Sequence, residues 1–213
     1  MSRTTVKATR RYDSSGRQHT ADLRRLSVLN AAGRRFLRDG YAATTVASIA
    51  GDAGVSVETV YKAFGGKPGL VRALWDQGLA GEAPVHAEVR SDEVSSTETD
   101  PTLIIATWAR LSAEVAPRVA PVLLLVRTAA TTDPDMQVLK DELDGQRLGR
   151  MAHNAEALAR GGHLREGITR QVARDVLFTY SAPEIYELLV LRRAWSVDDF
   201  AEFMRRGIVA ALL

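Results

Sequence analysis

Apolar residues recur every three or four positions along most of the chain, which is the spacing of an amphipathic α-helix. The first such run extends from Asp22 to Asp39 and ends at Gly40. Two short runs follow at 45–53 and 57–64, with Gly54 between them. Alternating β-branched runs and Asn-Gly turns, the usual signals of strands and hairpins, are nearly absent. The pattern predicts an all-α fold of about nine or ten helices.

Caps and prolines delimit the remaining helices. A helix is expected from Lys67 to about His86, with Pro68 suited to its first turn. Asp100 and Asp133 are each followed by proline, a pairing of N-cap and first helical position. The helices expected from Lys67 onward are therefore 67–86, 101–115, 117–131, 133–161, 169–180, 184–193 and 197–213. A polar acidic loop is expected at 90–100.

The segment from Thr45 to Phe64 has the spacing of a helix-turn-helix. Ala50 and Ala53 are small enough for two helix axes to approach, and Gly54 tolerates the left-handed backbone of the turn. Thr44 and Thr45 offer caps for the first helix, and Ser56 caps the second. The outer face of the second helix would carry Val57, Glu58, Thr59, Tyr61 and Lys62. An ordinary helical corner would show the same spacing.

Charge divides the chain into two parts. Residues 1–80 carry 13 basic against 6 acidic side chains, whereas residues 81–213 carry 15 against 20. A basic front half favours a polyanionic partner for that half alone. Residues 1–20 are polar and basic without periodicity, so we expect a disordered basic arm there.

Several pieces of the front half, in this order, resemble the DNA-binding domain of TetR-type (TetR/AcrR) transcriptional regulators. They are AAGRRFLRDGY at 31–41, TTVASIA at 44–50, AGVS at 53–56, TVYKAF at 59–64 and KPGL at 67–70. The resemblance implies a DNA-binding domain at 21–82 and a helical ligand-binding and dimerisation domain at 83–213. It implies a homodimeric repressor on a palindromic operator, released when a small-molecule effector binds.

The resemblance also implies individual contacts with DNA. Thr45 matches a capping residue that donates to a phosphate, Tyr61 matches a tyrosine that reaches the DNA backbone, and Lys67 matches a phosphate-binding lysine. Gly66 stands where the family usually has a capping serine, and Pro68 replaces an acidic or polar residue. These departures predict fewer side-chain contacts with phosphate at the start of that helix.

The second half carries candidate residues for an effector pocket and for a dimer interface. Aromatic and polarisable side chains can line an apolar cavity between helices, although most such residues are ordinary core. The pocket candidates are Trp108, Met136, Met151, His153, Phe178 and Tyr180. The two closing apolar stripes suggest an antiparallel four-helix dimer interface, with Ile185, Leu188, Leu189, Phe200, Phe203 and Met204 as candidates.

Other functions find little support in the residues. The chain has no cysteine, and its four histidines are scattered, so we expect no metal and no cofactor. No nucleophile–base–acid set stands out, so we do not expect an enzyme. No apolar run is long enough for a membrane span, and no signal peptide is visible, which favours the cytoplasm. The alternatives are a non-specific architectural DNA-binding protein without an effector, and a DNA-binding domain joined to an enzyme.

Overall fold

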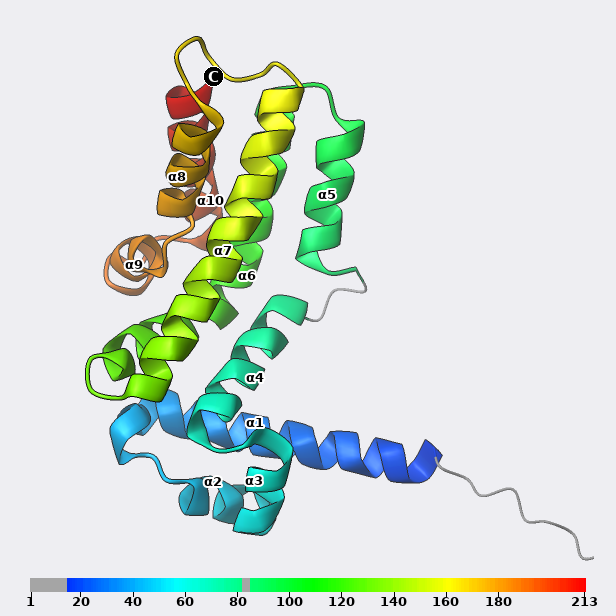
Figure 1. Cartoon of the computed structure of the whole chain (residues 1–213), viewed down its shortest axis with the longest axis vertical. Coiled ribbons are helices and arrows are strands. Elements are labelled where there is room, and N and C mark those ends of the chain that lie inside the picture. Colours follow the sequence, from blue (N-terminus) through cyan, green and yellow to red (C-terminus); the bar gives the residue numbers. More distant parts are fainter. Residues whose placement is uncertain (1–14, 82–84) are drawn as a thin grey trace, which may run out of the picture.

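The computed structural model describes residues 15–81 and 85–213, which form helices joined by short turns and contain no strand (Figure 1). The all-α prediction is confirmed. The amino-terminal domain consists of α1 (Ser15–Ala43), α2 (Val46–Ala53), α3 (Val57–Phe64) and α4 (Lys67–Ala80). The carboxy-terminal helices are α5 (Ala87–Thr97), α6 (Pro101–Ala130), α7 (Pro134–Arg160), α8 (Arg170–Tyr180), α9 (Pro183–Tyr186) with a π-helical continuation (Glu187–Leu191), and α10 (Val197–Leu212).

The start of α1 differs from the prediction of a basic arm at 1–20. Residues 1–14 lie outside the described part of the chain, but residues 15–20 already belong to α1. The sequence from 17 to 32 contains no glycine or proline, so polar residues with adequate helix propensity extend the helix ahead of its apolar stripe. At the other end Gly40 has a φ of 82°, which breaks the helical backbone where the sequence predicts.

The prediction of an acidic loop at 90–100 is wrong, because most of this stretch belongs to α5. Tertiary contacts hold this polar helix in place. Ser91 is buried, and Val94 packs against the core. Arg90 donates two hydrogen bonds to the Glu114 carboxylate on α6, at 3.0 and 2.6 Å. Such long-range partners override a local pattern that is typical of a surface loop.

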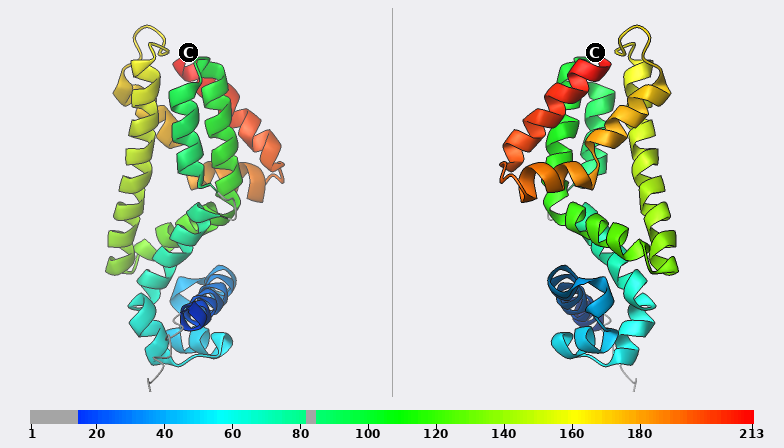
Figure 2. Two further views of the ribbon diagram at one scale, coloured as in Figure 1. Left: turned by 90° about the vertical axis from the view of Figure 1, so that its right-hand side faces the viewer. Right: turned by 90° about the vertical axis from the view of Figure 1, so that its left-hand side faces the viewer.

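The helices predicted at 101–115 and 117–131 are one helix, α6, which continues through Pro117 and Pro121. Each proline removes one backbone donor from the helical ladder, which favours a bend rather than an end when neighbouring helices support both sides. Figure 2 shows that α6 changes direction along its length. The helix packs against α1, α4, α5, α7, α9 and α10, so it connects both ends of the molecule.

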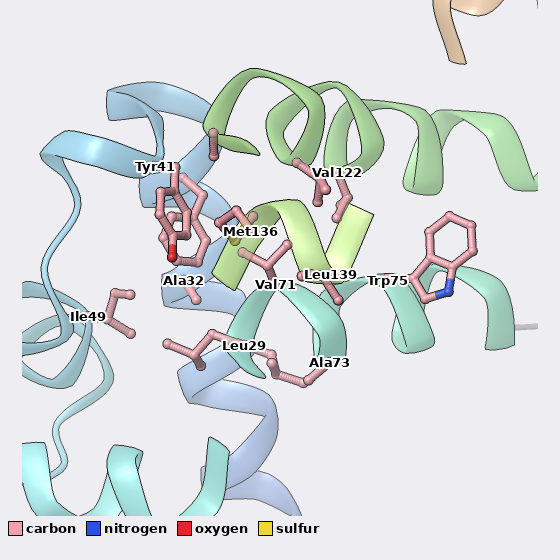
Figure 3. Close-up of a cluster of buried hydrophobic side chains, with 14 of the residues drawn as sticks. Leu29, Ala32, Tyr41, Ile49, Val71, Ala73, Trp75, Val122, Met136 and Leu139 are labelled. Carbon is pink, nitrogen blue, oxygen red and sulfur yellow. The ribbon is translucent and has the colours of Figure 1, made fainter. Parts of the chain in front are cut away.

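A continuous apolar cluster joins the amino-terminal domain to the carboxy-terminal helices (Figure 3). Phe36 on α1 and Val71 on α4 share this cluster with Val126 on α6 and Met136 on α7, and all four side chains are buried. We call it the junction cluster. A second cluster at the far end of the molecule includes Ile105, Leu158, Ala173, Met204 and Leu212. The amino-terminal domain therefore shares its core with α6 and α7.

The close approach of α4 to the end of α3 makes the stability of the protein sensitive to a side chain at Gly69. A Cβ at this position would lie 1.7 Å from the backbone oxygen of Phe64, so the backbone itself must move. We expect Gly69→Ala to lower the free energy of unfolding by about 1–3 kcal/mol or more, measured by urea denaturation. Gly51→Ala on α2 is the control, since a Cβ there meets nothing within 4 Å. It should raise stability by about 0.5–1 kcal/mol. Equal stability of the two variants would contradict the packing described here.

Candidate nucleic-acid interface and internal cavity

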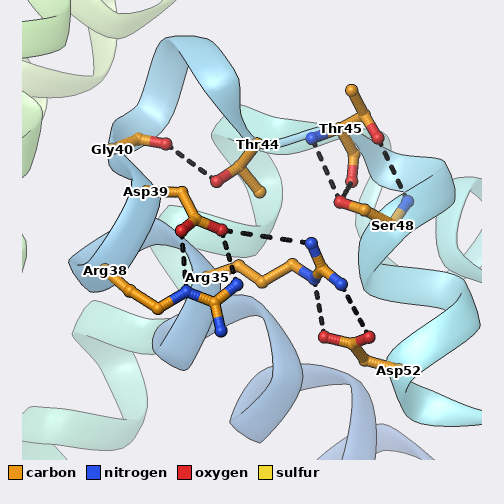
Figure 4. A network of polar contacts seen from close by, with 8 residues as sticks. All are labelled: Arg35, Arg38, Asp39, Gly40, Thr44, Thr45, Ser48 and Asp52. Atoms are coloured by element: carbon orange, nitrogen blue, oxygen red, sulfur yellow. Dashed lines mark hydrogen bonds and ion pairs between the residues drawn. The ribbon is translucent and has the colours of Figure 1, made fainter.

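The junctions around α2 and α3 have the geometry of a helix-turn-helix. Thr45 and Ser48 form a capping box, in which Thr45 Oγ1 accepts from the Ser48 N–H at 3.1 Å (Figure 4). Gly54 ends α2 in the left-handed region with a φ of 67°. Ser56 then caps α3 by accepting from the Thr59 N–H at 3.1 Å. Both helix starts therefore have the caps that the sequence predicts.

The outer face of α3 presents a mixed polar and apolar surface. Val57, Glu58, Thr59, Tyr61 and Lys62 are all exposed, and the Tyr61 side chain remains 53% accessible. Val60, which points the other way, is fully buried in the junction cluster. An exposed helix face held by buried residues behind it is the arrangement needed to enter a DNA groove.

Two residues predicted to contact DNA have partners within the chain. Thr44 is buried, and its hydroxyl donates to the Gly40 carbonyl at 2.8 Å, which removes it from the candidate interface (Figure 4). The broken backbone at Gly40 creates this free carbonyl. Lys67 Nζ donates to the Tyr41 carbonyl at 2.8 Å and lies 4.1 Å from the centre of the Tyr41 ring. A phosphate would have to compete with these contacts for the ammonium group.

An ion-pair network not foreseen from the sequence ties α2 to α1. Arg35 donates to both carboxylate oxygens of Asp52, at 2.6 and 2.7 Å (Figure 4). These hydrogen bonds, and then the charge of Arg35, hold the pKa of Asp52 below its ordinary value. Arg38 and Asp39 form a second pair on α1. The bidentate geometry fixes the orientation of α2, and hence of the following turn, relative to α1.

A cavity of about 190 Å³ lies among the carboxy-terminal helices and reaches α4. Its lining comes from α4 through α10, and much of it is apolar, with Val115, Val119 and Leu123 on α6. Three of the predicted pocket residues, Trp108, Met151 and Tyr180, are in this lining. A concave, mostly apolar space with few polar groups is typical of small-molecule sites.

The sequence matches the family model for bacterial regulatory proteins of the tetR family over residues 28–74. This match covers the helix-turn-helix and the beginning of α4. No curated protein matches the sequence. The matched segment of the amino-terminal domain is therefore similar to the tetR family.

Several solved structures of bacterial regulators share most of this fold. The fatty acid degradation regulator FadR from Bacillus halodurans superposes with a TM-score of 0.70 at 15% identity, covering 87% of this chain and 94% of that one. FadR from Bacillus subtilis in complex with stearoyl-CoA gives 0.70 at 18% identity, covering 89% and 100%. NalD from Pseudomonas aeruginosa, the secondary repressor of the MexAB-OprM multidrug efflux pump, gives 0.70 at 18% identity, covering 90% and 98%. Identities this low establish the fold alone.

Three other predicted pocket residues lie outside the cavity. Met136 is buried in the junction cluster, where it packs between the two domains. His153 is exposed, with Nε2 3.2 Å from Asp92 Oδ1. Phe178 lines an outer groove, where its ring stacks on Arg147. Neighbouring residues on a helix point about 100° apart, so Met151 and Asn154 face the cavity while His153 between them does not.

The cavity lining also contains polar residues that the sequence analysis did not select. They are Trp75 on α4 and Arg147 and Asn154 on α7. Trp75 Nε1, Arg147 Nε and Asn154 Oδ1 are buried without a hydrogen-bond partner. The spacing of Arg147, Met151 and Asn154 at positions i, i+4 and i+7 marks one helix face, which is the signal that could have found them.

The candidate dimer residues fall into two groups. Phe200 and Met204 close the subunit's own core, so the prediction that they form an interface is wrong. Ile185 and Leu189 are half-buried and pack against the same core. The exposed apolar surface at this end consists of Leu188, Leu191, Trp195, Val197 and Phe203. Of the six predicted residues, Leu188 and Phe203 therefore face solvent, and the other four pack against the core of the subunit.

The described residues offer neither a metal site nor a membrane-spanning helix. No group of three or more histidine or acidic side chains lies close enough together to hold a metal ion in the described part of the chain. No helix among the described residues is long and apolar enough to cross a membrane.

Substitutions at Ser56 separate the stability of α3 from its surface chemistry. Ser56→Ala removes the cap and should lower the free energy of unfolding by about 1 kcal/mol in urea denaturation. Ser56→Asp keeps an N-cap acceptor, so its stability should stay near wild type. The aspartate adds a negative charge to the exposed face, so DNA affinity should fall in this variant despite the intact fold. A strong loss of stability with Ser56→Asp would contradict the capping role.

Proposed function

We propose that this chain is an effector-responsive transcriptional regulator, most simply a repressor, that places α3 in the major groove of its operator. The observation that carries the proposal is the exposed outer face of α3 on a fully capped helix-turn-helix. The net positive charge of residues 1–80 supports a nucleic-acid partner for this end of the molecule. The match of residues 28–74 to the tetR family model supports the same function.

A second copy of this chain would complete the DNA-binding unit. The apolar surface formed by Leu188, Leu191, Trp195, Val197 and Phe203 is continuous with α9, its π-helical continuation and α10. Burying it against the same surface of another subunit would give a two-fold axis, and two copies of α3 would then read a palindromic operator. The area around these side chains, rather than the inward stripe of α10, is the interface that we propose.

The cavity is the proposed effector site, and α4 is its connection to α3. Trp75 and Leu79 bring α4 to the cavity lining. Gly78 allows close contact with α6, since a Cβ there would lie 3.1 Å from Val119, and Arg118 donates to the Gly78 carbonyl at 3.0 Å. An effector that prefers a different position of α4 would shift the two α3 helices, by no more than its difference in affinity for the two states.

The fold of the neighbours leaves the identity of the effector open. FadR from Bacillus subtilis was solved with stearoyl-CoA and SmeT with triclosan, on similar folds at 18% and 16% identity. Both ligands combine apolar and polar parts, as the cavity lining does here. A non-specific DNA-binding protein is the second candidate, favoured by the same basic charge. It predicts steep salt dependence with little preference among sequences.

The first test concerns the outer face of α3. An operator is selected from a random-sequence duplex library, and affinity is measured by fluorescence anisotropy at fixed salt. Lys62→Ala and Tyr61→Phe should each weaken operator binding by about 1–3 kcal/mol if they contact bases or ordered phosphates. Lys140→Ala on α7 removes the same charge far from α3 and should leave affinity unchanged. Wild-type affinity in both α3 variants, or equal affinity for all duplexes, would contradict sequence-specific reading by this face.

The second test concerns dimerisation. Sedimentation equilibrium of the wild type at tens of micromolar should give twice the 23.2 kDa mass of the chain. The double variant Leu188→Asp, Phe203→Asp places charges in the proposed interface and should sediment as a monomer, because burying an unpaired charge is strongly unfavourable. Leu103→Asp, at an exposed position on α6, is the control and should remain dimeric. A monomeric wild type would rule out the dimer and the palindromic operator together.

A further inference from the structure

One face of α7 gives the cavity a cation with few partners. The Arg147 side chain is only 11% exposed. Its Nη1 donates to the Phe178 carbonyl at 2.8 Å and to Ser181 Oγ at 3.2 Å, and its guanidinium carbon lies 3.6 Å from the centre of the Phe178 ring. Its Nε has no hydrogen-bond partner. These neutral groups accept from Nη1 alone, so three of the five guanidinium donors, one on Nε and two on Nη2, have no neutral acceptor.

The charge of Arg147 is incompletely balanced. Its Nη2 donates to Asp144 Oδ1 at 3.4 Å, and the same carboxylate lies 3.0 Å from Lys140 Nζ. Two cations therefore share one carboxylate. Glu184 is close enough to add a favourable charge but forms no ion pair with Arg147. Arg150, the other arginine of the cavity, has Asp92 at 2.6 Å and Ser91 Oγ at 2.7 Å. Burial lowers the pKa of Arg147, which shows that its environment disfavours the charged form.

A second donor in the cavity lining comes from α4. An ion pair between Arg72 and Glu142 joins α4 to α7. Trp75 follows Arg72 by three residues and Arg147 follows Glu142 by five, and both are in the cavity lining. Trp75 Nε1 is buried and has no acceptor (Figure 3 shows the indole at the edge of the junction cluster). Asn154 Oδ1, an unpartnered acceptor, lies about 10 Å further along α7 at 1.5 Å per residue.

We propose that the cavity binds a small amphipathic molecule whose carboxylate pairs with Arg147 and accepts from Trp75, with its apolar body along Val115, Val119 and Leu123 of α6. The proposal rests on the proposed function of the cavity as an effector site. The Nε–H of Arg147 and the Nε1–H of Trp75 are both buried, so binding requires a side chain of the cavity lining to rotate. The volume of about 190 Å³ lies below the roughly 300–1,000 Å³ of sites for drug-sized ligands, which favours a short chain.

Three probes of equal chain length test the proposal: octanoate, 1-octanol and octylamine. Trp75 and Trp108 line the cavity and Trp195 does not, so the full-length Trp195→Phe protein reports cavity binding by its intrinsic fluorescence. We expect saturable binding of octanoate, with an affinity about ten-fold or more above that of octanol, since a hydrogen bond to a charged group contributes at least this factor. Octylamine, whose charge matches that of Arg147, should bind more weakly than octanol.

Two variants test whether Arg147 causes the preference for octanoate over octanol. Arg147→Met removes the charge at similar side-chain length and should abolish the preference for octanoate while leaving octanol affinity unchanged. Arg160→Met, at an exposed position near the end of α7, is the matched control and should behave as wild type. Unchanged octanol binding also shows that the cavity has survived the substitution. If Arg147→Met fails to fold, the comparison of the three probes on the parent protein decides by itself.

The outcomes separate this proposal from the one on which it rests. Equal or tighter binding of octanol or octylamine, absence of octanoate binding, or full octanoate affinity in Arg147→Met would each overturn the proposed carboxylate site. Operator binding is measured on the same proteins without probes. If operator binding persists while the preference for octanoate is absent, only the ligand class is wrong. If no operator is selected, the proposed regulatory function fails, whatever the cavity binds.

Discussion

The packing of Phe36 and Val71 against Val126 and Met136 is the interaction on which the arrangement of this molecule depends. It joins α1 and α4 to α6 and α7 in one apolar core, where each buried side chain contributes about 1.5–3 kcal/mol relative to exposure. Because α1 and α4 are held there, the short helices α2 and α3 are carried in a defined orientation. The kinked α6 extends the same support to the cavity.

The two faces of α3 illustrate how stability and contact chemistry are divided. Val60 points into the junction cluster and fixes the helix, whereas Tyr61 and Lys62, one step along the chain, remain exposed. Ser56 and Thr45 satisfy backbone donors at the helix starts, and the Arg35–Asp52 pair adds orientation from outside. The exposed side chains thus contribute little to holding the helix and remain available for a partner.

The cavity has the opposite character, because its walls hold polar atoms that the fold leaves unsatisfied. An unpartnered buried donor or acceptor costs about 1–3 kcal/mol. Trp75, Arg147 and Asn154 place such atoms around one space, and the one other such side-chain atom among the described residues is Arg90 Nε on α5. Buried polar atoms without partners lower stability, and such atoms are expected at sites where a protein binds a ligand.

Local signals in the sequence predicted the elements that depend on local physics. The caps at Thr45, Ser56 and Asp133, the turn at Gly54 and the apolar stripes placed most helices correctly. The errors came where distant contacts decide. The long-range partners of Arg90 and Ser91 make α5 a helix, and the supports of α6 carry it through Pro117. Periodicity showed that α10 has an apolar face, but only the packing showed that Phe200 points inward.

Which side chains of α7 point into the cavity likewise depends on how the helices pack. Met151 and His153 differ by two positions on α7, yet one lines the cavity and the other contacts Asp92 at the surface. Residue type alone selected aromatic and sulfur-containing candidates, which are found equally in ordinary cores. The choice among them required knowing which face of α7 meets α4 and α6.

The shared junction cluster has a consequence for how such proteins can be recombined. A segment ending near residue 82 looks like a portable module, since the chain there passes from one domain to the next. Its core, however, includes Val126 and Met136 from beyond that point. A chimera that transplants the segment alone would expose Phe36 and Val71 or leave them facing a surface of a different shape. Substitutions on the exposed face of α3 would alter the proposed DNA contacts without disturbing this shared core.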